Sequence, residues 1–200
     1  MTGSFLPQPQ ITPEVQALYD EDLAETGYVW NASRLWAYQP ETVQGLFDLM
    51  SQAFKPSRLS FRQRGILVTA TASSLGDSYC SLAWGGKLAA ASEPDLAAGV
   101  LKGRDDKLSE QEKAMADWAR KVVRDPNATT PADIQALRDA GLDDDQIFAI
   151  TGFVALRLAF STINDSLGAQ PDRELVESLP EEVVDAVTYG RPVSPDCERD

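Results

Sequence analysis

The chain has 200 residues, of which 43% are hydrophobic and 24% are charged, a composition typical of one compact globular domain. Its formal net charge is -13 at pH 7. Because phosphate backbones and anionic headgroups repel an acidic surface, we expect no nucleic acid and no membrane as a partner.

The sequence contains no histidine, which removes the commonest general base near neutral pH and the commonest metal ligand. Neither a Ser-His-Asp triad nor a Cys-His pair can form, and two cysteines with scattered carboxylates cannot build a Cys/His zinc site. We therefore expect no metal and no other cofactor. Any catalysis has to use Cys, Asp, Glu, Lys, Arg or Tyr side chains.

The two cysteines, Cys80 and Cys197, are too few for the disulfide framework of a small secreted protein. The first ten residues, MTGSFLPQPQ, lack the basic and apolar regions of a secretory signal. The apolar stretches that begin at Ile66 and Phe148 fall short of the roughly 20 residues of a spanning helix, and the second contains Arg157. We therefore expect a cytoplasmic protein in which both stretches form core helices.

Five helices are predicted in the first half of the chain from their start and stop signals. Thr12 before Pro13 is typical of a helix start, with a capping hydroxyl and proline in the first helical position. Pro40 disfavours helix in the residue before it, and Gly76 ends a helix. Asp77 can accept hydrogen bonds from the free amides of the helix that follows. The predicted helices lie at about 13–27, 32–38, 41–54, 60–76 and 77–91.

The second half of the chain shows signals of the same kind. Ser109 and Glu112, three residues apart, form a capping box, and the acids from Asp143 to Asp145 favour the amino end of a long helix. Helices are predicted at about 109–125, 130–140, 146–165, 172–178 and 180–189. Because no alternating strand pattern is seen, the predicted fold class is all-α, with one domain over 1–190 and a flexible polar tail over 191–200.

The helices at 60–76 and 77–91 are expected at the centre of the fold, packed as an antiparallel hairpin. The later turns of the first show no polar face, so that helix should be almost wholly buried. Gly85 and Gly86 would each weaken the second helix by roughly 1 kcal/mol relative to alanine. Their presence suggests that another backbone approaches closely at this point.

Two segments resemble the alkylhydroperoxidase AhpD-like (carboxymuconolactone decarboxylase) family, in its peroxidase-related branch. One is RQRGILVTATASSLGDSYCSLAWGGKL, from Arg62 to Leu88. The other is LRDAGLDDDQIFAITGFVALRLAFSTINDSLGAQPD, from Leu137 to Asp172. The resemblance implies an AhpD-like multi-helical bundle around a central antiparallel helix hairpin, and assembly into a homo-oligomer.

The motif of that family is a Glu, eleven residues, a Cys-x-x-Cys pair, three residues and a His. With the register set by Tyr79-Cys80, the glutamate falls on Gly65, the first cysteine on Asp77 and the histidine on Trp84. In the family, the second cysteine attacks the peroxide, the first resolves the sulfenic acid, and Glu and His move protons. The resemblance therefore implies Cys80 as the catalytic residue, with the other three positions replaced.

The residues around Cys80 act on its thiol in opposite directions. The first turn of a helix favours a thiolate, whereas the charge of Asp77 and cover by Trp84 favour the neutral thiol. The simplest interpretation makes Asp77 a helix cap and Trp84 part of the core. Arg62 and Arg64 could supply a compensating cation, but exposed arginines are more often solvated.

Two functions remain open at this point. One is a thiol-dependent hydroperoxide reductase that acts through Cys80 with an external thiol as reductant. The alternative is a catalytically degenerate relative that binds a small apolar ligand or serves as an oligomeric structural protein, motivated by Gly65, Asp77 and Trp84. Lactone decarboxylation ranks last because it needs a proton-transfer residue, and a histidine-free site would have to supply a carboxylate or a tyrosine in that role. Cys197 could in principle reach Cys80 as a distant resolving thiol.

Overall fold

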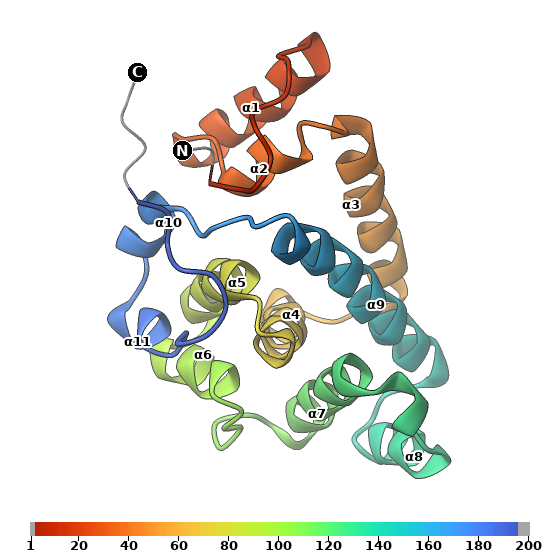
Figure 1. Cartoon of the computed structure of the whole chain (residues 1–200). Helices are drawn as coiled ribbons and strands as arrows, with labels where there is room; N and C mark the ends of the chain where they lie inside the picture. Colours follow the sequence, from red (N-terminus) through yellow and green to blue (C-terminus); the bar gives the residue numbers. More distant parts are fainter. Residues whose placement is uncertain (1–2, 196–200) are drawn as a thin grey trace.

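The computed structural model describes residues 3–195, and this part of the chain is all-helical, as predicted. The described residues form eleven α-helices and two short 3-10 turns, and they contain no strand (Figure 1). The α-helices are α1 (Pro13–Thr26), α2 (Asn31–Trp36), α3 (Pro40–Phe54), α4 (Phe61–Leu75), α5 (Ser78–Ala91), α6 (Pro94–Leu101), α7 (Glu110–Arg124), α8 (Pro131–Asp139), α9 (Asp144–Ser166), α10 (Arg173–Glu177) and α11 (Glu181–Val184).

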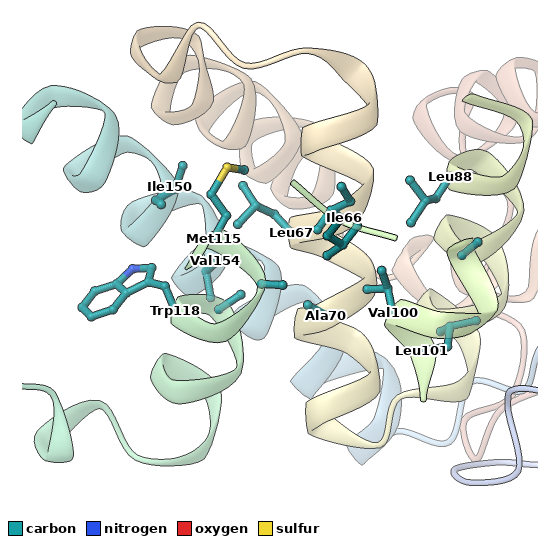
Figure 2. Close-up of a cluster of buried hydrophobic side chains, with 14 of the residues drawn as sticks. Ile66, Leu67, Ala70, Leu88, Val100, Leu101, Met115, Trp118, Ile150 and Val154 are labelled. Atoms are coloured by element: carbon teal, nitrogen blue, oxygen red, sulfur yellow. The ribbon is translucent and has the colours of Figure 1, made fainter. Parts of the chain in front are cut away.

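Helix α4 lies at the centre and packs against α5, α6, α7 and α9 (Figure 1). Figure 2 shows its apolar side chains between α7 and α9 on one side and α5 and α6 on the other. Residues from all five helices share this core, among them Ile66, Leu67, Leu88, Val100, Met115 and Val154. The prediction of a buried α4 paired with α5 as a central antiparallel hairpin is therefore confirmed.

The predicted caps define where several helices begin and end. Thr12 Oγ1 accepts a hydrogen bond from the amide of Val15, and Ser109 with Glu112 forms the predicted capping box. Gly76 ends α4 with φ of 83°, a left-handed conformation that glycine adopts without steric cost. Asp77 follows at once as the cap of α5, so the hairpin turn needs only two residues.

Three features differ from the sequence prediction. Helix α6 was not predicted, and α10 and α11 are shorter than the helices predicted at 172–178 and 180–189. No other backbone closes on Gly85 and Gly86. A Cβ at Gly85 would lie 2.9 Å from Val183 Cγ1, and one at Gly86 would lie 2.2 Å from Leu179 Cδ2. The two glycines therefore make room for side chains near α11.

Helix α9 has the length and apolar composition that would suffice to cross a membrane. In this structure its inner face packs against α3, α4 and α7 instead. That face also carries the buried polar residues Arg157, Ser161 and Asn164. As predicted, α9 is a core helix, and its polar residues face the interior.

The carboxy-terminal segment returns to the start of α5. Ser78 Oγ donates to the carbonyl of Arg191 at 2.8 Å, and the Arg191 guanidinium donates to the carbonyl of Asp165. The amide of Ser194 donates to the carbonyl of Pro171 at 2.9 Å. Residues 191–195 of the predicted tail thus make ordered contacts, whereas Cys197 lies outside the described residues.

A buried network anchors the first turn of α5 to distant parts of the chain. The Tyr79 hydroxyl donates to Asp172, whose other carboxylate oxygen accepts from the amide of Asn31 at 2.8 Å. The amide of Ala32 donates to the same hydroxyl at 3.2 Å. Burial raises the pKa of Asp172 to about 6. Residues 31–32, 79 and 172 hold the start of α5, and with it Cys80, in place.

Candidate functional site

Cys80 occupies the first turn of α5 and is buried, with 3% of its surface exposed. It belongs to an apolar cluster built from α2, α3, α4, α5 and α9. The buried members of this cluster are Trp36, Val43, Met50, Val68, Ala72, Cys80, Phe153 and Phe160. An apolar setting of this kind favours the neutral thiol over the thiolate.

Helix α9 brings two polar groups to the sulfur of Cys80. Arg157 Nη2 donates to Cys80 Sγ at 3.3 Å, and Ser161 Oγ lies 3.6 Å from the same sulfur. Burial, and next the charge of Asp77, raise the pKa of the Cys80 thiol, while Arg157 and Ser161 act to lower it. The raising effects prevail, so the thiol is protonated at neutral pH.

Asp77 is completely buried and caps α5, as predicted. Its Oδ1 accepts the hydrogen bond of the Cys80 amide at 2.9 Å, and its Oδ2 has no hydrogen-bond partner among the described residues. The Asp77 carboxylate accepts the hydrogen bond of the Cys80 amide, so this amide is not free to stabilise a thiolate. The carboxylate also adds a negative charge near the Cys80 sulfur. Both effects oppose a thiolate at Cys80.

Gly65 lies in the middle of the packed hairpin and leaves little space for a larger side chain. A Cβ at this position would lie 3.3 Å from Leu88 Cδ1 and 3.4 Å from Leu88 Cβ. A glutamate at position 65 would therefore require Leu88 to move. The α4–α5 hairpin is therefore closely packed at position 65, where the resemblance implies the glutamate of the family motif.

Trp84 lies one turn after Cys80 and packs partly against the same cluster, as predicted. It is only half-buried, however, and three cationic groups surround its ring. The distances to the ring centroid are 5.3 Å from Arg64 Cζ, 5.6 Å from Arg157 Cζ and 5.4 Å from Lys87 Nζ. Trp84 is therefore the centre of a cation–aromatic cluster as well as a packing residue.

The expectation that Arg62 and Arg64 are simply solvated is wrong for both residues. Arg62 Nε is 2.8 Å from Glu112 Oε1 in an ion pair between α4 and α7. Arg64 turns inward and lies 5.3 Å from the rings of Phe54 and Phe153 as well as Trp84. Burial, and next the charge of Arg157, lower the pKa of Arg64.

Comparison with solved structures decides the fold. The chain superimposes with a TM-score of 0.75 on the AhpD-core, uncharacterized peroxidase-related protein from Ralstonia eutropha JMP134, at 23% identity over 86% of this chain and 94% of that one. The chain has the AhpD-like fold. A peroxidase-related protein from Silicibacter sp. TM1040 gives the same TM-score of 0.75 at 20% identity, over 86% of this chain and 94% of the other.

A third neighbour with the AhpD-like fold has a different activity in its name. The debrominase Bmp8 matches with a TM-score of 0.70 and 14% identity, over 92% of this chain and 96% of that one. A cysteine-to-alanine variant of that debrominase was solved in complex with 2,3,4-tribromopyrrole. No family model and no curated protein matches this chain. The AhpD-like fold is therefore established from structure.

The sequence analysis missed two residues that contact Cys80, namely Arg157 and Ser161. They come from α9, far along the chain from Cys80, and only packing brings them to its sulfur. One signal was visible, because Arg157 is the single charged residue between Asp145 and Asp165 in an otherwise apolar helix. A charge in such a position has to find a polar partner inside the fold.

The described residues include no group of three or more Cys, Asp or Glu side chains able to hold a metal ion. The Cys80 sulfur is contacted by the Arg157 guanidinium and the Ser161 hydroxyl, and the Cys80 amide donates to Asp77. Arg64 lies over the same Trp84 ring as Arg157. This arrangement supplies positive charge and aromatic surface close to a protonated thiol. Among residues 3–195 Cys80 is the single cysteine, and the position before α5 is occupied by Asp77.

Proposed function

We propose that the chain is a divergent member of the AhpD-like, peroxidase-related family that binds a small ligand at its Cys80 site and does not reduce peroxides. The observation that carries this proposal is the state of Cys80, a buried and protonated thiol. Peroxide attack needs a thiolate, a proton for the leaving oxygen and a second thiol to discharge the sulfenic acid. The site offers none of these ready for use.

A second candidate is a thiol-dependent hydroperoxide reductase in which Cys80 acts alone and an external thiol completes the cycle. The contact of Arg157 with Cys80 Sγ at 3.3 Å favours it, because a guanidinium stabilises a thiolate. The debrominase neighbour supports a broader range of activities on this fold. We also propose a cytoplasmic location, in which Cys80 would stay reduced.

A peroxidase assay separates the two candidates. We expect the wild-type protein, given an alkyl hydroperoxide and a dithiol, to consume peroxide no faster than the Cys80→Ser variant, because the thiol is protonated and shielded. Peroxide loss is measured against a buffer blank over a range of enzyme concentrations. Turnover at an ordinary enzyme rate, roughly 1–10³ s⁻¹, that disappears in Cys80→Ser would establish the reductase and reject our proposal.

We also propose a homo-oligomer that associates through the outer face of α9. This face has no charged residue between Gln146 and Asp165, and Phe148 on it is 81% exposed. An exposed apolar surface of this kind is typical of protein interfaces.

Light scattering tests the oligomer. The wild type is expected to give a mass well above that of the single 21.8 kDa chain, and Phe148→Glu is expected to shift the protein towards the single-chain mass. The glutamate places a charge in the interface and costs its desolvation. A single-chain mass for the wild type across a wide concentration range would contradict the proposal.

A further inference from the structure

Arg157 is a buried cation that forms no ion pair with any of residues 3–195. It is 5% exposed, and its two acceptors are both sulfur atoms, Cys80 Sγ at 3.3 Å and Met50 Sδ at 4.0 Å. Its Nε is buried and has no hydrogen-bond partner among the described residues. Because burying an uncompensated charge is costly, a guanidinium in this state is poised to bind an anion.

Arg64 provides a second guanidinium at the same place. Its Cζ lies 5.3 Å from the centroid of the Trp84 ring, over which Arg157 also lies, and its Nε is likewise buried without a partner. Aromatic rings contact the faces of a guanidinium, whereas its hydrogen-bond donors lie in the plane of the group. The in-plane donors of Arg64 make no hydrogen bond to a described residue, so they are free for a ligand.

No acidic residue among residues 3–195 forms an ion pair with the three cations around Trp84. The sequence has 31 Asp and Glu against 18 Lys and Arg, yet no carboxylate among residues 3–195 forms an ion pair with Arg64, Lys87 or Arg157. Asp77, the nearby acid, holds the Cys80 amide instead. Three cations therefore lie around the Trp84 ring without an ion-pair partner among the described residues, in a strongly acidic protein.

The surroundings indicate what kind of anion fits. Trp84 is half-buried, and Phe61, 53% exposed, lies with its ring centroid 6.1 Å from that of Trp84. Lys87 is exposed beside the same ring. Phe61 and Lys87 are thus exposed to solvent beside Trp84. Arg157 and Cys80 are buried behind them. Such a site suits a molecule with an anionic head and an apolar body.

We propose that Arg64 and Arg157 bind the carboxylate of a small organic acid whose apolar body packs on Trp84 and Phe61, beside Cys80. This inference rests on the proposed ligand-binding function and names the class of its ligand. Two guanidinium groups supply charge-assisted hydrogen bonds to one anion, which are stronger than neutral ones. The acid acts as the counter-ion that the protein itself does not supply.

The experiment compares acids with neutral molecules of the same shape. Thermal unfolding and calorimetric titration are performed with sodium benzoate and sodium octanoate, with benzamide and octanamide, and with sodium phosphate, all at constant ionic strength. We expect at least one of the two carboxylates to raise Tm and to bind about tenfold or more tightly than its amide, as loss of a charge-assisted bond implies.

The variants assign the effect to the two arginines. Arg64→Gln and Arg157→Met are each expected to weaken carboxylate binding about tenfold or more, whereas Arg124→Gln, which removes an exposed arginine at the end of α7, leaves it unchanged. Without ligand, Arg157→Met is expected to keep or raise Tm, because it removes an uncompensated buried charge.

Several outcomes would overturn the inference. Amides that bind as tightly as both acids would leave a ligand-binding function standing and remove the anion site. Phosphate binding as tightly as the carboxylates would show an inorganic anion site instead. A lower Tm of Arg157→Met without ligand, with carboxylate binding unchanged, would make Arg157 a purely structural residue. Peroxide turnover, by contrast, bears on the proposed function and not on this test.

Discussion

Replacing Phe153 by alanine is expected to lower the free energy of unfolding by about 3–5 kcal/mol, the range for deleting a large buried aromatic side chain. Phe153 has no exposed surface and lies on α9 at the point where the Cys80 cluster meets α3 and α4. Its ring centroid is 4.7 Å from that of Phe54, and Arg64 Cζ lies 5.3 Å above it. Alanine would leave a cavity beneath Arg64.

Urea unfolding at fixed protein concentration measures this effect, with Phe153→Leu as the matched control. Leucine keeps most of the apolar volume, so its cost is expected to stay at about 1–2 kcal/mol. A loss of less than about 1 kcal/mol for the alanine variant would mean that the cluster collapses around the gap. In that case the cluster would not hold Arg64 and Cys80 as rigidly as the packing implies.

The double variant Asp77→Cys with Trp84→His is expected to raise the rate of hydroperoxide reduction by about 10²-fold or more over the wild type. The cysteine removes the charge beside Cys80 and supplies a resolving thiol within the same helix turn. The histidine supplies proton transfer, which alone is typically worth roughly 10²–10⁴-fold, and its smaller ring uncovers the site. Loss of the Asp77 cap costs about 1 kcal/mol of stability.

Gly65 stays unchanged in this test, because a side chain there would press on Leu88 at 3.3 Å and confuse loss of folding with loss of activity. The rate is measured with an alkyl hydroperoxide and a dithiol, and the control adds Cys80→Ser to the double variant. We expect that control to remain inactive. If the folded double variant is as slow as the wild type, Asp77 and Trp84 are not what blocks the chemistry, and burial of Cys80 alone has to explain it.

Most of the helices could be predicted because their signals are local. Thr12, Ser109 and Asp143 cap the helices that follow them through hydrogen bonds within three residues, and such bonds depend little on the rest of the fold. The apolar residues of α4, which leave no polar face in its later turns, also predicted that this helix is buried. The all-α class therefore followed from local patterns, whereas the AhpD-like fold with its central hairpin was implied by the resemblance of two segments to that family.

The sequence also determined what the site cannot contain. It has no histidine, and Gly65, Asp77 and Trp84 occupy the positions where the resembling family has its glutamate, first cysteine and histidine. The capping role of Asp77 was predictable for the same local reason as the other caps. Only Cys80 was left as a candidate, and its position in the first turn of α5 was predicted correctly.

Only the tertiary structure decided what surrounds Cys80. Arg157 and Ser161 are 77 and 81 residues away from it, so their contacts with its sulfur depend on how α9 packs against α5. Arg64 turned inward because the rings of Trp84 and Phe153 accept its charge, an arrangement that no local pattern specifies. Burial and local charge both depend on neighbours from several helices. Together these neighbours leave the Cys80 thiol protonated, and neither Arg64 nor Arg157 forms an ion pair with a described residue.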